Sequence, residues 1–105
     1  MSEFIAVLIT VPHREEGLRI AGALVAEKLA ACVNQAGEVN SVYRWQGKME
    51  SSLECLLIAK TKRSLFEDLA GRVKELHSYT VPEIIALPIE AGNPEYLKWI
   101  EESTR

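Results

Sequence analysis

An unbroken apolar run near the start of the chain places the strongest constraint on its fold. Residues 4–11, FIAVLITV, carry no charged side chain and are rich in β-branched residues. Such a run predicts a β-strand that is covered on both faces or lies in the centre of a sheet, because a strand with one solvated face alternates apolar and polar residues. Pro12 ends the run. The rest of the chain must therefore supply neighbouring strands and a covering layer.

Apolar spacing predicts two long helices. Residues 14–31 and 64–77 both place apolar side chains at intervals of three and four, which puts them on one face of a helix. The residues on these two faces are Leu18, Ala21, Leu24, Val25 and Leu29, then Leu65, Leu69, Val73 and Leu76. Ser64 and Glu67 have the spacing of a capping box, so we expect the second helix to begin there.

The remaining segments predict strands and one short helix. Residues 31–61 contain two runs in which apolar residues alternate, and Gln46-Gly47 between them is typical of a tight hairpin turn. Residues 83–89 predict a short strand. Residues 93–103 predict a last helix, because the segment opens with an asparagine cap followed by proline.

This order predicts a ferredoxin-like βαββαβ sandwich of the α+β class, with a short C-terminal helix. Two helices would cover one face of a four-stranded antiparallel sheet. The length of 105 residues predicts a single domain, residues 1–105. The hairpin over about 32–61 is long for such a domain and leaves Trp45 and two strand edges exposed. We therefore expect other copies of the chain to cover them.

Charge and composition exclude several classes of protein. The 12 basic and 15 acidic residues give a net charge of −3, which argues against nucleic acid as the main partner. No stretch approaches the length of a membrane span, so no membrane partner is expected. The N-terminal segment lacks the basic region and cleavage site of a signal peptide. Cys32 and Cys55 are therefore expected as free thiols in a reducing cytoplasm.

Three motifs give the chain a family resemblance. The segment SVYRWQGKME is similar to the central hairpin of the CutA family, the divalent-cation tolerance proteins. AEKLAACVN and ELHSYTVPEIIALPIEAGNPEYLKWI resemble the end of that family's first helix and its closing half. Arg44 replaces a frequent second tryptophan, and Ser78 a usual proline. The resemblance implies a homotrimer in which strands of neighbouring subunits continue one another's sheets, as in PII signalling proteins, and an association with copper and other divalent metals.

His77 is the candidate metal ligand. An imidazole is a common ligand of copper and zinc, but a histidine in the last turn of a helix can equally cap backbone carbonyls. In copper-binding relatives the resemblance implies a cysteine late in the first strand and two consecutive histidines at the end of the second helix. Ile9 and Leu76 stand at two of these positions and cannot coordinate a metal, so His77 alone remains. His13 and Cys32 are not at a recognised chelate spacing with it.

A second candidate site joins aromatic and charged residues at positions where the resemblance implies clefts between subunits. It would be a small-molecule or anion pocket with a basic and an acidic wall. The alternative is that the same side chains only close an interface, where tyrosine and tryptophan are enriched. The residues of this predicted intersubunit pocket are Tyr43, Trp45, Lys60, Tyr79 and Glu83.

The expected function is divalent metal tolerance or response, with copper or another divalent metal as the possible ligand. The alternative is a PII-like sensor or scaffold that binds a small molecule between subunits. No Gly-rich phosphate loop, zinc-protease or hydrolase motif is present, so neither an enzyme nor an organic cofactor is expected.

Overall fold

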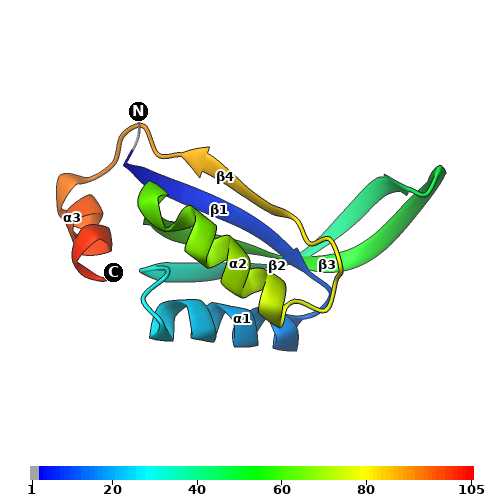
Figure 1. The fold of residues 1–105 in the computed structure, drawn as a ribbon. Helices are drawn as coiled ribbons and strands as arrows, with labels where there is room; N and C mark the ends of the chain where they lie inside the picture. Colours follow the sequence, from blue (N-terminus) through cyan, green and yellow to red (C-terminus); the bar gives the residue numbers. More distant parts are fainter. Residues whose placement is uncertain (1–2) are drawn as a thin grey trace.

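The computed structural model describes residues 3–105, so Met1 and Ser2 of the predicted domain lie outside it. The order of elements is the predicted one (Figure 1). The elements are β1 (Phe4–Val11), α1 (Arg14–Ala26), β2 (Cys32–Trp45), β3 (Lys48–Lys62), α2 (Phe66–Leu76), β4 (Ile84–Pro88) and α3 (Pro94–Glu102), with a 3₁₀ turn at Arg63–Leu65.

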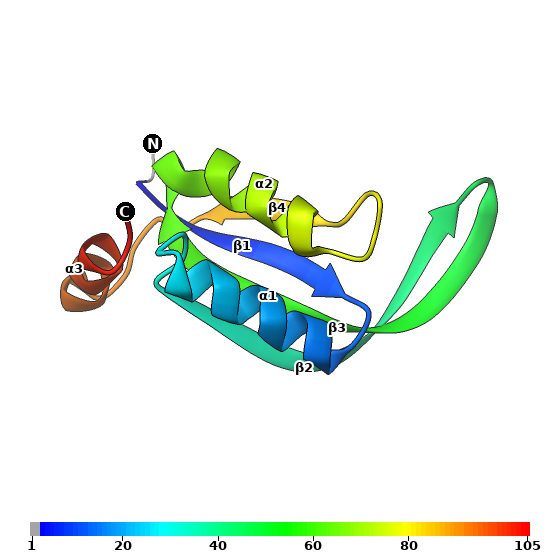
Figure 2. The ribbon, with the colours of Figure 1, turned by 60° about the horizontal axis from the view of Figure 1, so that its bottom comes forward.

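The four strands form one antiparallel sheet in the order β2-β3-β1-β4. The central place predicted for residues 4–11 is therefore confirmed. Both α1 and α2 cover the same face of this sheet, whereas α3 lies beyond one end of it (Figures 1 and 2). Alternate residues of β1 meet the two helices in the core, which buries Ile5, Val7, Ile9, Val11, Ile20, Leu24, Leu57, Leu69 and Val73.

The opposite face of the sheet is apolar as well, and we call it the open face. In its middle row Leu8 lies between Ile58 of β3 and Ile85 of β4. Leu87 follows on the same side of β4, and Ile85 and Leu87 are each 50% exposed. Neighbouring exposed apolar side chains of this kind are typical of surfaces that contact another protein.

The β2–β3 hairpin extends well beyond the rest of the molecule (Figures 1 and 2). Its predicted turn at Gln46-Gly47 is confirmed, and both residues have positive φ, of 50° and 80°. Opposed residues share a face of a hairpin, so Tyr43 and Trp45 lie on one face and Val42 and Met49 on the other. All four are exposed. The distal hairpin therefore presents apolar side chains on both of its faces.

Two helix boundaries differ from the predictions. The first helix ends at Ala26 instead of residue 31, because Lys28 adopts a left-handed backbone (φ 60°) that turns the chain back. The capping box predicted at Ser64 and Glu67 was wrong. Ser64 lies inside the 3₁₀ turn, and the N-cap residue of α2 is Leu65, which makes no side-chain capping bond. The predicted asparagine cap of the last helix is confirmed.

Candidate functional site

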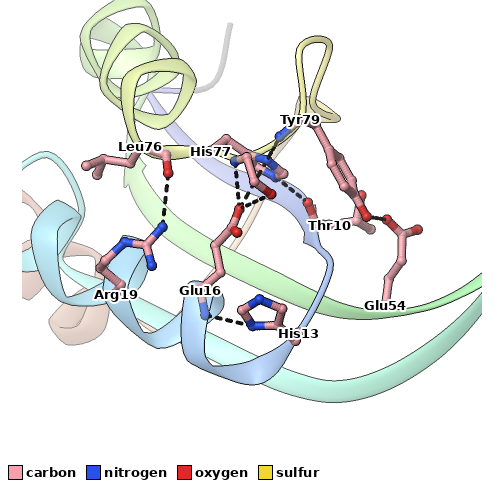
Figure 3. Close-up of polar contacts among 9 residues, drawn as sticks. Thr10, His13, Glu16, Arg19, Glu54, Leu76, His77 and Tyr79 are labelled. Carbon is pink, nitrogen blue, oxygen red and sulfur yellow. Dashed lines mark hydrogen bonds and ion pairs between the residues drawn. The ribbon is translucent and has the colours of Figure 1, made fainter.

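His77 ends α2, and its imidazole ring is completely buried (Figure 3). Its backbone amide donates to the carbonyl of Val73 at 2.8 Å. Its Nε2 lies 2.7 Å from the carbonyl oxygen of Thr10 and donates to it. Its Nδ1 accepts the backbone amide of Tyr79 at 3.0 Å. The ring thus ties the end of α2 to the central strand and to the loop that follows.

Glu16, in the first turn of α1, is buried beside this ring (Figure 3). Its Oε2 accepts from the amide and the hydroxyl of Ser78, at 2.9 and 3.0 Å, and lies 3.3 Å from Nδ1 of His77. Burial pushes the pKa of Glu16 up, but the bonds from Ser78 and the nearby His77 and Arg19 outweigh burial and leave this pKa below its ordinary value. We call Thr10, Glu16, His77, Ser78 and Tyr79 the His77 cluster.

A copper ion bound to His77 would need a free ring nitrogen, and the cluster occupies both. Ile9 and Leu76 occupy the two positions where the family resemblance implies further ligands. Ile9 lies in the apolar core, and Leu76 packs against that core. Over residues 3–105, no group of three or more His, Cys, Asp or Glu side chains is placed to hold a metal ion. The residues present therefore do not fit a copper centre at His77.

The other metal-ligating side chains do not join His77. His13 is the N-cap of α1, where its Nδ1 accepts the amide of Glu16 at 3.3 Å (Figure 3). Cys55 is buried in the core, opposite β1. Cys32 lies opposite Lys60 at the other end of the hairpin. Both thiols are free.

A pocket of about 400 Å³ opens on the other side of the Tyr79 loop, where the hairpin leaves the body of the protein. We call it the hairpin-root pocket. Strands β1, β2 and β3 and the loop before β4 contribute its walls. It is lined by Thr10, Ser41, Val42, Tyr43, Glu54, Tyr79, Val81 and Glu83.

Two tyrosines and two carboxylates give this pocket its chemistry. The Tyr79 hydroxyl donates to Oε2 of Glu54 at 2.8 Å (Figure 3). Burial and the Glu54 carboxylate raise the pKa of Tyr79 well above its ordinary value, so the phenol keeps its proton at neutral pH. The Tyr43 hydroxyl accepts from Ser52 at 3.3 Å, and Thr10 donates to Glu83 at 3.5 Å. The pocket is thus built from hydrogen-bonding groups around two acids.

The structure brings together three of the five residues predicted for the intersubunit pocket. Tyr43, Tyr79 and Glu83 line the hairpin-root pocket. Trp45 lies next to the hairpin turn, and Lys60 contacts the Asn34 side chain toward the far end of β3. At about 3.3 Å per residue, Lys60 lies roughly 20 Å along the strand from Glu54. The predicted basic wall is therefore not part of this pocket within one chain.

Sequence reasoning missed Glu54 and Glu16, and both were hidden by their local context. Glu54 alternates with apolar residues in β3, which is the pattern of a solvent-facing position. Glu16 is in the first turn of a helix, where acids are usual on the surface. Both carboxylates instead meet the loop after α2, about 25 and 62 residues away along the chain. Only the tertiary structure reveals these contacts.

The fold and sequence both match known proteins. The family described as CutA1 divalent ion tolerance protein matches residues 5–103. The divalent-cation tolerance protein CutA of Thermus thermophilus is 56% identical over 98 residues, covering 93% of this chain and 95% of the relative. The rice protein CutA 1, chloroplastic, is 52% identical over 101 residues. That match covers 96% of this chain but 57% of the rice protein, so the chain spans little more than half of this plant relative.

Solved structures agree with this result. The Cut A1 structure from Thermus thermophilus superposes with a TM-score of 0.95 at 54% identity, covering 97% of this chain and 99% of that one. CutA1 from Oryza sativa gives a TM-score of 0.96 at 51% identity, covering 99% and 95%. The sheet order and helix placement define a ferredoxin-like α+β protein, as predicted. The chain belongs to the CutA family of divalent-cation tolerance proteins.

Two further predictions concern enzyme activity and a membrane span. The CutA family consists of non-enzymatic tolerance proteins, which agrees with the prediction that this chain is not an enzyme. Within residues 3–105, no helix has both the length and the apolar composition needed to cross a bilayer.

Proposed function

We propose that this chain acts in divalent-cation tolerance as a single-domain homotrimer that binds a ligand at the hairpin-root pocket. The observation that carries the proposal is the amount of apolar surface that one chain leaves uncovered. The open face and both faces of the distal hairpin carry exposed apolar side chains, and β2 and β4 are the edge strands of the sheet. Exposed edges and large apolar patches are usually covered in the functional state.

A closed ring of three copies would cover the exposed apolar surfaces and pair the edge strands at the same time. The sheets would pack their open faces, and each projecting hairpin would reach a neighbouring copy and extend its sheet. The hairpin-root pocket lies where the hairpin leaves the body, so a neighbouring copy would complete its wall. Trp45 and Lys60, which lie outside the pocket in one chain, would then be supplied by other copies. The family resemblance supports this arrangement.

Sedimentation equilibrium of the purified chain tests the assembly. We expect a single species of about three times the chain mass of 11.7 kDa, unchanged over a hundredfold dilution from micromolar concentration. A stable species with the mass of one chain would overturn the trimer and leave the apolar surfaces unexplained.

Binding of copper or another divalent metal is a second proposal, supported by the family's description as divalent ion tolerance proteins, but the geometry of the His77 cluster argues against His77 as the ligand. Because both ring nitrogens are engaged, we expect His77→Ala to lower the free energy of unfolding by about 2 kcal/mol without changing copper affinity. The measurement is calorimetric titration of metal-free protein with Cu(II), and with Cu(I) under anaerobic conditions.

The exposed His13 provides the matched control for this titration, since His13→Ala also removes an imidazole. Stoichiometric copper binding that is lost in His77→Ala and kept in His13→Ala would show that the cluster opens to hold the metal. Equal isotherms for all three proteins would place any bound copper elsewhere.

The compartment is also a proposal. Relatives differ: the rice protein is described as chloroplastic, and the Archaeoglobus fulgidus structure as a periplasmic protein. For this chain we propose the cytoplasm, supported by its two free thiols.

A further inference from the structure

We propose that His77 is a proton-sensitive switch of the Tyr79 loop, residues 77–83: the neutral ring holds the backbone amide of Tyr79, and the protonated ring releases it and binds Glu16 instead. The starting observation is that two groups of opposite character meet one ring nitrogen (Figure 3). The Tyr79 amide donates to Nδ1 at 3.0 Å, and Oε2 of Glu16 lies 3.3 Å from the same atom. A ring nitrogen accepts when it is bare and donates when it carries a proton, so it cannot serve both partners at once.

Thr10 decides which nitrogen of the neutral ring carries the proton. Nε2 lies 2.7 Å from the carbonyl oxygen of Thr10, which can only accept, so the single proton of the neutral ring is on Nε2. Nδ1 is then an acceptor, and the Tyr79 amide is its donor. A second proton makes Nδ1 a donor, which repels the amide hydrogen and is attracted by the Glu16 carboxylate. The two protonation states of the ring therefore favour two different partners.

The surroundings of Glu16 keep this carboxylate charged while a histidine ring titrates. Burial raises the pKa of Glu16, but the two bonds from Ser78 and the positive charge of Arg19 help to leave this pKa below its ordinary value. Arg19 is itself held beside the cluster, where it donates to the carbonyl of Leu76 at 3.2 Å. An ionised acceptor is therefore in place when His77 takes up its second proton.

The switch is connected to the hairpin through Tyr79. The Tyr79 ring packs against the imidazole with 4.7 Å between ring centroids, and its hydroxyl donates to Glu54 of β3 at 2.8 Å. On β1, the hydroxyl of Thr10 donates to Glu83 at 3.5 Å, so this second carboxylate also lies behind a direct neighbour of the ring. Release of the Tyr79 amide would loosen one wall of the hairpin-root pocket, to which Tyr79 and Glu83 both belong. We therefore expect protonation to regulate that wall.

The switch lies inside one chain, so it does not depend on what covers the outer surface. The side chains of His77 and Glu16 are 0% and 4% exposed before any copies assemble. Their partners Thr10, Ser78 and Tyr79 all belong to the same chain. The inference therefore goes beyond the proposed trimer and its ligand, and it stands or falls separately from them.

The test is nuclear magnetic resonance of the purified, assembled protein between about pH 8 and pH 5, where histidine rings ordinarily titrate. We expect the Nδ1 resonance of His77 to change from that of a bare nitrogen to that of a protonated one. Over the same pH interval the protection factor of the Tyr79 amide against hydrogen exchange should fall at least about tenfold. A ring that stays neutral throughout, or a protonated ring with an unchanged Tyr79 amide, would overturn the proposal.

His77→Gln is the decisive variant, because glutamine can donate to Thr10 and accept from Tyr79 as the neutral ring does, but takes up no proton in this range. We expect the protection factor of the Tyr79 amide to become independent of pH. His13→Asn is the matched control, since His13 is the second of the two histidines, its side chain is 56% exposed, and asparagine is also a good N-cap. This control should keep the pH dependence of the wild-type chain. An equal loss of protection in His77→Gln would show that another group drives the change, and the switch would be wrong.

Glu16→Gln tests the second partner and keeps the proposal testable if His77→Gln does not fold. Glutamine still offers an oxygen to Ser78 but lacks the charge that attracts the protonated ring. We expect the loss of Tyr79 protection to move to lower pH by at least about one unit. A transition at the same pH as in the wild-type chain would show that Glu16 does not receive the proton-bearing nitrogen, which contradicts the exchange of partners.

Discussion

An aspartate in place of Ile85 is expected to leave the chain folded but to separate it from its copies. Ile85 is half exposed in one chain, next to Leu8 on the open face, so the substitution costs the isolated fold at most about 1 kcal/mol of strand preference. In the assembly the same position would be buried. An unpaired carboxylate would then be taken out of water in every subunit, at a cost of several kcal/mol each.

The expected measurement is a shift in sedimentation from the trimer to the mass of one chain at micromolar concentration, with the far-ultraviolet circular dichroism retained. Val25→Asp is the matched control. Val25 is 43% exposed, a value close to that of Ile85, but it lies on α1 in the helical layer. We expect this control to remain trimeric. An Ile85→Asp protein that stays assembled would show that the open face is not the contact between copies.

The architecture was predictable because each element carries its own periodicity. The apolar run at 4–11 required a central strand, and the spacings of three and four specified two helices that cover one face. The turn at Gln46-Gly47 was readable because a tight hairpin needs positive φ at its central residues, which glycine adopts without strain. These are local signals. The order of elements that they give along the chain predicts the ferredoxin-like antiparallel sheet.

The end of α1 could not be read in the same way. The apolar pattern continues through Leu29, yet the helix stops at Ala26, because Leu29 and Ala30 enter the core from a turn centred on Lys28. A lysine in a left-handed conformation has no sequence signature. The amides of Leu29 and Ala30 both bond to the carbonyl of Leu24, which satisfies the helix end without glycine.

The candidate sites were only partly predictable, because their key contacts join distant parts of the chain. His77 was readable as a residue that either ends a helix or binds a metal. Its actual partners, Thr10 and Glu16, are about sixty or more residues away, and no local pattern links them. The same holds for Glu54, whose strand position resembles an outward-facing one. No sequence motif therefore predicts the two carboxylates of the hairpin-root pocket, which the fold brings together.

The second large effect is expected from Glu16→Leu, which removes the acceptor at the centre of the His77 cluster. The amide and hydroxyl of Ser78, an exposed residue, lose their bonds to the buried Glu16 carboxylate. We expect the free energy of unfolding to fall by about 3 kcal/mol at pH 7, because two hydrogen bonds to a charged acceptor are lost. Chemical denaturation at one fixed protein concentration measures this loss.

Glu15, the acid next to Glu16, is the control, because it carries the same charge at the start of α1. Glu15 is also in the first turn of α1, but its side chain is 83% exposed. Glu15→Gln is therefore expected to change the free energy of unfolding by less than about 0.5 kcal/mol. A similar loss in both variants would mean that the negative charge at the helix start, rather than the buried contact to Ser78, is what stabilises the fold.

Glu16→Gln then isolates the charge, because glutamine still offers an oxygen to Ser78. Folding lowers the pKa of Glu16 below its ordinary value of 4.5. The carboxylate's contribution is therefore complete above about pH 4.5 and is lost as the pH falls through the folded pKa. The stability difference between the wild-type chain and Glu16→Gln should shrink as the pH is lowered below that range. A difference that stays constant down to about pH 3 would show that the charge of Glu16 plays no part, and that shape alone holds the end of α2 against α1.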